Sequence, residues 1–168
     1  MLFRSVIRVS EGADAVEAGS IRRWLEPKEF ECAIHSDDEA ARAVGYEGIV
    51  APATMVFTYG LPAYWQPGAP PAQAGDEPRQ IPIPVIFDVP APCTLSFATS
   101  VDVQFHAPLH IGDRLTVTHR LVDIAKKSLS VGDGAFLTQE DTYTNQRDEI
   151  VAISRLVIFR FNPPGDSE

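Results

Sequence analysis

The sequence predicts an α+β fold, in which an antiparallel sheet wraps around one central buried helix. Residues 52–60 are apolar on nearly every side, which is typical of a helix buried all round. Residues 94–162 alternate between apolar and polar side chains, the period of half-buried strands. Nine of the 14 prolines lie between Pro62 and Pro92, and none lies between 109 and 162. A proline-rich connection should therefore separate the helix from an uninterrupted strand meander.

Residues 1–60 are expected to be helical in pieces, with three helices. The first begins after Ser20 and runs from Ile21 to Leu25, because Pro27 then ends it. The second begins at Ser36, where Ser36 and Glu39 have the spacing of a capping box, and ends at Gly45. The third is the buried helix 52–60, in which a proline occupies the favourable first position.

Four strands are expected in the meander. The second runs over 115–121 after a turn at 108–113, and His119 on its inner face is expected to be half-buried and hydrogen-bonded. Gly132–Asp133–Gly134 marks the next turn. Two strands follow over 136–144 and 150–161, and the last is apolar on both faces and should lie centrally. The first strand should direct six residues to one face: Leu95, Phe97, Thr99, Val101, Val103 and Phe105.

Composition excludes several classes of function. Acidic residues outnumber basic ones by 23 to 14, giving a net charge of −9, so neither nucleic acid nor an anionic membrane surface is expected as a partner. Cys32 and Cys93 match no disulfide framework or zinc site, and no cofactor or metal is expected. No apolar run approaches the ~18 residues of a membrane span and no signal peptide is visible, so we expect a cytoplasmic protein. The length of 168 residues favours a single domain over 1–168.

Two segments resemble a known family. Residues 34–52, IHSDDEAARAVGYEGIVAP, resemble the run from the catalytic loop into the central helix of MaoC-like and fatty-synthase-type dehydratases. Residues 103–115, VQFHAPLHIGDRL, resemble the strand and "P-L-x-x-G-D-x-L" turn of the same family. The resemblance is to the N-terminal type of domain. It implies a hot-dog fold, with the proline-rich segment 61–93 as an insertion and a second hot-dog subunit as partner.

The family's hydratases carry a D-x-N-P-x-H motif, and His35 falls on its histidine. Phe30 stands where the motif has Asp, so the resemblance leaves the carboxylate to a neighbour, and Glu31 is the best candidate. The H-G-L segment of many members is also replaced, by Ala51–Thr54. Hydration of an enoyl thioester needs a base and an acid, and His35 and Glu31 are the predicted catalytic residues.

The same reaction needs N–H donors for the thioester oxygen and an apolar acyl pocket. Unpaired backbone N–H groups at the start of the central helix suit the first role. Aromatic side chains at the helix end and in the proline-rich loop suit the second. The predicted substrate-binding residues are Ala53, Thr54, Phe57, Tyr59, Tyr64 and Trp65.

Three functions remain open at this point. The first is hydration or dehydration of a 2-enoyl or 3-hydroxyacyl thioester, carried on CoA or an acyl-carrier protein, by a homodimer or higher homo-oligomer. The second is a non-catalytic acyl-binding subunit, in a heterodimer with a catalytic hot-dog subunit. The third is a diverged dehydratase or cyclase of polyketide metabolism.

Overall fold

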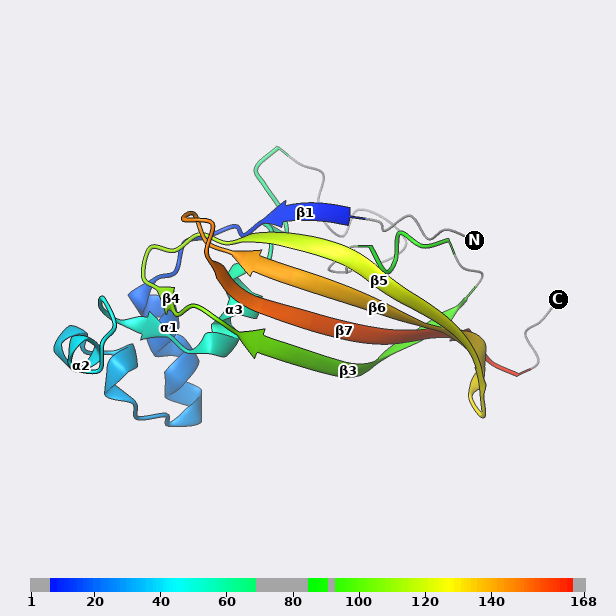
Figure 1. Cartoon of the computed structure of the whole chain (residues 1–168), viewed down its shortest axis with the longest axis horizontal. Helices are drawn as coiled ribbons and strands as arrows, with labels where there is room; N and C mark the ends of the chain where they lie inside the picture. Colours follow the sequence, from blue (N-terminus) through cyan, green and yellow to red (C-terminus); the bar gives the residue numbers. More distant parts are fainter. Residues whose placement is uncertain (1–6, 69–84, 91–92, 165–168) are drawn as a thin grey trace.

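The computed structural model describes residues 7–68, 85–90 and 93–164. Its centre is a five-stranded antiparallel sheet in the order β1-β5-β6-β7-β3 (Figure 1). The strands are β1 (Ile7–Glu11), β3 (Leu95–Phe105), β5 (Thr116–Leu129), β6 (Gly132–Thr144) and β7 (Ile150–Asn162). A separate pair consists of β2 (Val50–Ala51) and β4 (Leu109–His110). The predicted α+β class and meander are confirmed, and β7 lies between two other strands, as its apolar faces indicate.

Short helices gather at one end of the sheet (Figure 1). They are α1 (Ala18–Leu25), α2 (Asp38–Ala43) and α3 (Val56–Tyr59), with 3₁₀ turns η1 (Glu26–Lys28), η2 (Ala33–His35) and η3 (Ala53–Met55). No helix of the described residues is long and apolar enough to cross a membrane. All three predicted helices exist, but each is short, and their stability depends on packing against the sheet.

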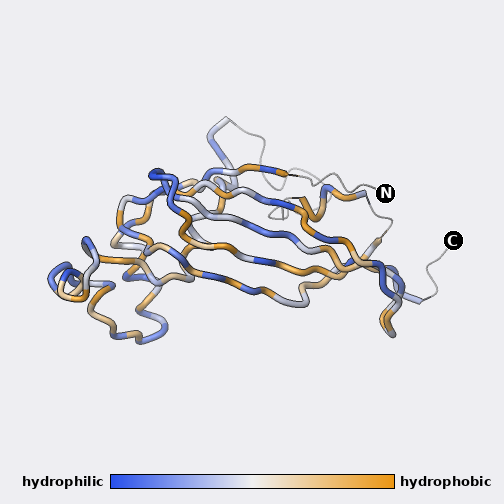
Figure 2. The backbone as a smooth tube through the Cα atoms, in the orientation of Figure 1, coloured by the Kyte–Doolittle hydropathy of each residue, from blue (hydrophilic) through white to orange (hydrophobic). Residues whose placement is uncertain are grey.

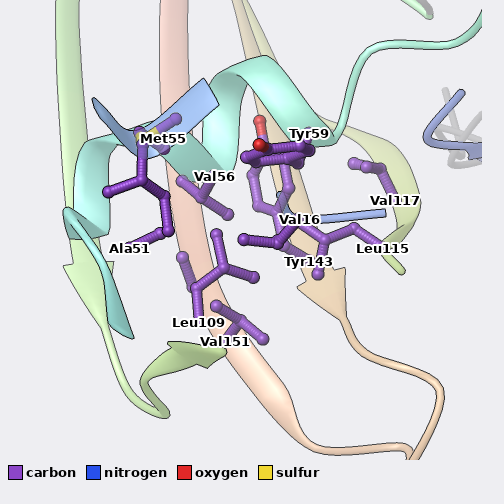
Figure 3. Packing of buried hydrophobic residues seen from close by; sticks show 12 residues of the cluster. Val16, Ala51, Met55, Val56, Tyr59, Leu109, Leu115, Val117, Tyr143 and Val151 are labelled. Carbon is purple, nitrogen blue, oxygen red and sulfur yellow. The ribbon is translucent and has the colours of Figure 1, made fainter. Parts of the chain in front are cut away.

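The main hydrophobic core lies between α3 and the sheet (Figure 3). Met55, Val56 and Tyr59 are buried on one side of the helix. Ala53, Thr54 and Phe57 are exposed on the other, so the prediction of a helix buried all round is wrong for the single chain. The helix covers the sheet with one face only, and no described part of the chain covers its outer face. The buried members of this cluster are Val16, Ile21, Ala51, Met55, Val56, Tyr59, Leu109, Leu115, Val117, Tyr143, Val151 and Ala152.

A second core cluster lies farther along the sheet. Val85 and Ile86 are fully buried there against Leu121, Leu137 and Ile158. Two hydrogen bonds hold the segment down: Arg160 Nη1 donates to the carbonyls of Ile86, at 3.1 Å, and Val89, at 2.8 Å. The described part 85–90 of the proline-rich segment is therefore a cover for the sheet. Residues 69–84 and 91–92 of the predicted insertion lie outside the described residues.

Strand β3 does not keep one face. Phe97 pairs with Phe159, but the register shifts between Ala98 and Ser100, so Thr99 is a β-bulge. After the bulge Val101 lies opposite Leu156, on the face opposite to that of Phe97, since a single extra residue turns a strand over. The predicted common face of 95–105 is wrong for this reason. Hydrophilic and hydrophobic stretches alternate along the strands in Figure 2.

Three local predictions are corrected by the structure. Asp37, not Ser36, caps α2, because its carboxylate accepts from the N–H groups of Glu39 at 2.7 Å and Ala40 at 3.0 Å. Residues 7–11 form strand β1, which the prediction of helices alone missed. The hairpin between β5 and β6 turns at 130–131, and Gly132 and Gly134 belong to β6. A Cβ at Gly134 would lie 2.1 Å from the Arg160 carbonyl oxygen, so close contact with β7 requires glycine there.

Polar side chains form a network inside the sheet's covered face. His119 is buried, and its Nδ1 lies 2.8 Å from Asp141 Oδ1 while its Nε2 lies 2.8 Å from Ser10 Oγ. The prediction of a hydrogen-bonded interior histidine is confirmed. Tyr143 borders this network. Burial, with the nearby Asp141 charge, raises the pKa of Tyr143 to about 12, and a hydrogen bond with Ser154 opposes the rise.

The Tyr143 shift predicts a loss of stability at high pH. A phenol that is harder to ionise in the folded chain stabilises the fold fully below the unfolded pKa of 10.0, and this contribution is lost as pH rises towards 12. Urea unfolding measured across this pH window should show that the free energy of unfolding falls by about 2–3 kcal/mol because of this group. Tyr143→Phe keeps the ring but has no proton to lose, so its stability should fall less. Equal falls in both proteins would contradict the assignment.

Candidate functional site

The site is centred on His35, the last residue of η2. Its ring Nδ1 lies 2.7 Å from the carbonyl oxygen of Val50. A carbonyl can only accept, so Nδ1 carries the proton of this bond, and in the neutral ring Nε2 holds the lone pair. Nε2 makes no hydrogen bond to the described residues. The imidazole is therefore held in one tautomer with a basic nitrogen unused.

The Val50 carbonyl is itself held in place by α2. Asp38 Oδ1 accepts from the backbone N–H of Ile49 at 3.0 Å. Arg42 donates to Asp38 Oδ2 at 3.2 Å and, through Nε, to the carbonyl of Glu47 at 3.2 Å. Two side chains one helical turn apart thus bind the segment 47–49 that leads into β2. We call this pair of side chains the α2 clamp.

Two hollows meet at His35. The larger is an open cleft of about 820 Å³ between α1, η1 and η2, and its apolar wall includes Leu25, Phe30 and Ile49. The smaller, of about 160 Å³, lies between His35, β2, β4 and the first residue of η3, Ala53. His35 lines both. A molecule that reaches from one hollow to the other would pass this ring.

The structure places both predicted catalytic residues in the larger cleft. Glu31 lines it, four residues before His35, but the side chain is exposed and no hydrogen bond joins the two. Phe30, at the motif's Asp position, lies beside the imidazole, with ring centroids 5.9 Å apart. An aromatic ring therefore occupies the place where the motif has a carboxylate. Within the described residues, no acidic group is hydrogen-bonded to His35.

The predicted substrate-binding residues are only partly brought together. Ala53 lines the smaller hollow beside His35, and Thr54 follows it on the exposed side of η3. The first N–H groups of such a turn have no acceptor within the turn. These two residues can therefore offer backbone donors next to His35.

The four aromatic residues do not reach His35. Tyr59 is only 4% exposed and its hydroxyl accepts from the N–H of Glu17 at 3.1 Å, which makes it a core residue (Figure 3). Phe57 packs edge-on against Tyr143. Tyr64 and Trp65 are about half exposed, and none of the four lines either hollow. The apolar wall comes from α1 and from residues 30 and 49, which the sequence analysis missed because no periodic pattern links them.

The described residues hold no group of three His, Cys, Asp or Glu side chains placed to bind a metal ion. Arg22 is the basic residue on the wall of the larger cleft, and it forms an ion pair with Glu26. The site thus offers an imidazole base, backbone donors and an apolar cleft.

Comparison with known proteins agrees with this picture. Residues 6–154 match the model of the family described as "FAS1-like, dehydratase domain region". The chain is 33% identical, over 153 residues, to a "Probable enoyl-CoA hydratase alpha subunit" of Thermomonospora curvata. It is 31% identical, also over 153 residues, to the "3-oxo-4,17-pregnadiene-20-carboxyl-CoA hydratase alpha subunit" of Mycobacterium tuberculosis. Each match covers 90% of this chain and 47% of the relative, so the chain spans about half the length of these curated relatives.

A solved structure supports the fold. A chain in the crystal structure of the ChsH1-ChsH2 complex of Mycobacterium tuberculosis superposes with a TM-score of 0.70 and 28% identity. The superposition covers 95% of this chain and 85% of the other. The predicted hot-dog fold and the resemblance to MaoC-like and fatty-synthase-type dehydratases are both confirmed.

The α2 clamp leads to a prediction about local order. Asp38→Ala removes the acceptor of the Ile49 N–H, so hydrogen exchange at that amide should accelerate roughly tenfold, the equivalent of one hydrogen bond. Asp38→Asn retains an acceptor oxygen and should preserve most of the protection. Exchange measured residue by residue tests this, and unchanged protection in Asp38→Ala would show that the clamp does not hold the segment before Val50.

Proposed function

We propose that this chain, which belongs to the FAS1-like dehydratase domain family, forms one hot-dog half of an acyl-thioester hydratase. The observation that carries the proposal is the His35–Val50 hydrogen bond, which leaves Nε2 unprotonated in the neutral form of a ring that lines both the apolar cleft and the hollow at the start of η3. The substrate would be a 2-enoyl thioester, or a 3-hydroxyacyl thioester in the reverse direction.

Each part of the site has a place in this reaction. The acyl chain would occupy the larger cleft, and the thioester oxygen would accept from the N–H groups of Ala53 and Thr54. His35 Nε2 would take a proton from water as the water oxygen bonds to C3 of the enoyl group. A proton is then delivered to C2, either from His35 itself or from a protonated Glu31, which afterwards regains the proton that His35 took from water. The elements of one water molecule are added, OH at C3 and H at C2, with no net oxidation or reduction, so the proposal requires no cofactor.

Two features favour a second hot-dog subunit. Strand β3 is an edge strand of 11 residues with exposed apolar side chains on both of its faces, among them Phe97 at 43% and Val101 at 57%. Such an edge can pair with another strand. The relatives are named alpha subunits, and the ChsH1-ChsH2 structure is a complex. We propose that β3 is the edge along which a second hot-dog domain docks, and that the assembly is cytoplasmic.

The second candidate function keeps this assembly and moves the chemistry to the partner. Phe30 beside His35, where the motif has a carboxylate, favours it. In that case this chain would shape the acyl cleft, and the partner would carry the complete acid–base pair. Both candidates predict that the chain binds acyl thioesters.

Hydration of crotonyl-CoA by the purified chain separates the two. If His35 is the base, His35→Ala should lower kcat/KM by about 10²–10⁴. Glu31→Gln should lower it by about tenfold or more if Glu31 delivers the proton. His106→Gln changes an exposed histidine outside both hollows and should leave the rate unchanged.

The outcomes differ clearly. The non-catalytic role would be supported if the wild-type chain binds crotonyl-CoA without hydrating it and the reaction occurs only when a second hot-dog subunit is added. In that case His35→Ala in this chain should have no effect on the rate of the complex. A wild-type chain that neither binds nor hydrates any acyl thioester would overturn the proposed function in both forms.

A further inference from the structure

His110, on strand β4, has an unusual environment. Both of its ring nitrogens are buried, and neither has a hydrogen-bond partner in the described part of the chain. Both of its backbone groups are hydrogen-bonded to Asp113: the N–H donates to Asp113 Oδ2 at 2.9 Å, and the carbonyl accepts from the Asp113 N–H at 3.1 Å. Buried polar side-chain atoms are almost always hydrogen-bonded, so two unpaired nitrogens on one ring indicate a missing partner.

A hollow lies beside this ring. It has a volume of about 240 Å³, and His110 lines it together with residues of three loops. It adjoins the smaller hollow at His35, because Tyr46, Ala107 and Pro108 line both. The remaining lining residues are Gly45, Glu47, Arg147 and Glu149.

The wall of this hollow carries more acidic than basic groups, with Glu47 and Glu149 against Arg147. Arg147 donates to Asp113 at 3.0 Å and to Glu149 at 2.9 Å, so its guanidinium already has two carboxylate partners. A neutral imidazole offers one donor and one acceptor. The hollow therefore suits a neutral polar group that both donates and accepts, such as an amide, better than it suits an anion.

The ring can present its nitrogens without repacking. A half-turn about the Cβ–Cγ bond exchanges each nitrogen with a ring carbon inside the same volume. The edge-on contact with Tyr46, at 6.4 Å between ring centroids, involves the ring as a whole and survives the turn. A ligand in the hollow would thus satisfy His110 by a change of one side-chain torsion.

We propose that the His110 hollow is a subsite for an amide of the pantetheine arm of an acyl thioester. The inference rests on the proposed function, since it takes the thioester group to lie in the smaller hollow at His35. In pantetheine two methylene groups separate the sulfur from the first amide, so that amide falls in the adjoining space. CoA and acyl-carrier proteins carry the same arm, and the subsite would recognise either.

The test compares thioesters with and without the amide. Three crotonyl probes are titrated into the wild-type chain and His110→Phe: crotonyl-CoA, crotonyl-N-acetylcysteamine, which keeps the first amide alone, and S-propyl thiocrotonate, which has none. The variant should bind the first two about 3- to 10-fold more weakly, the loss of one hydrogen bond, and the third equally well. A uniform change over all three, no change, or no binding by the wild-type chain would overturn the proposal.

Stability supplies a second readout. Phe keeps a ring against Tyr46, and no described group bonds the His110 nitrogens in the ligand-free chain, so the Tm of the variant should change by less than about 2 °C. A larger fall in Tm would mean that the nitrogens already have a structural partner, and would overturn the subsite. His106→Phe is the matched control: His106 is exposed and lines neither hollow, so its binding of all three probes should be unchanged.

The same titrations separate this inference from the proposed function. A chain that binds the amide-bearing probes through His110 but does not hydrate them would contradict catalysis and keep the subsite. A chain that hydrates them with no dependence on His110 would do the reverse. Crotonyl-CoA compared with a crotonyl carrier protein identifies the source of the arm, and the His110→Phe loss should be equal for both.

Discussion

The hydrogen bond from His35 Nδ1 to the Val50 carbonyl is the contact on which the account of the site depends. It decides which ring nitrogen is basic, and it joins the loop before α2 to strand β2. Strand β2 is in turn paired with β4, which brings His110 to the same place. The α2 clamp holds the segment before Val50 from the other side. Three separate stretches of the chain thus meet at one backbone carbonyl, and the two hollows and the His110 hollow lie around it.

Much of the fold can be predicted from patterns among residues that are close together in the sequence. Strands β5, β6 and β7 and the order of elements were predicted from alternation and from the position of proline, since these depend only on neighbouring residues. The bulge at Thr99 could not be predicted, because it is defined by the register with β7, and it turns Val101 away from the face of Phe97. Strand β1 could not be predicted either. Its alternating segment is short, and it forms a strand because it pairs with β5 at the edge of the sheet.

The site was predicted in part for a similar reason. His35, Glu31 and Ala53 were found through a linear motif and a helix start, and the structure brings all three to the two hollows. The aromatic residues are predicted only from their type and from their place near the helix end and in the proline-rich loop. Tyr59 instead forms core contacts, because its hydroxyl finds the Glu17 N–H, and Tyr64 and Trp65 lie elsewhere on the surface. Leu25, Ile49 and His110 meet the site through tertiary contacts between segments far apart in sequence, and no pattern within one segment indicates them.

The central claim is that His35 presents a basic Nε2 to a bound thioester, and ring nitrogen-15 NMR of His35 tests it most directly. The spectrum of the neutral ring should show Nδ1 protonated and Nε2 unprotonated, since the Val50 carbonyl can only accept. Adding butyryl-CoA, which cannot be hydrated, should shift the Nε2 resonance and leave Nδ1 nearly unchanged. A neutral ring protonated at Nε2, or an Nε2 resonance that does not respond to saturating butyryl-CoA, would contradict the account.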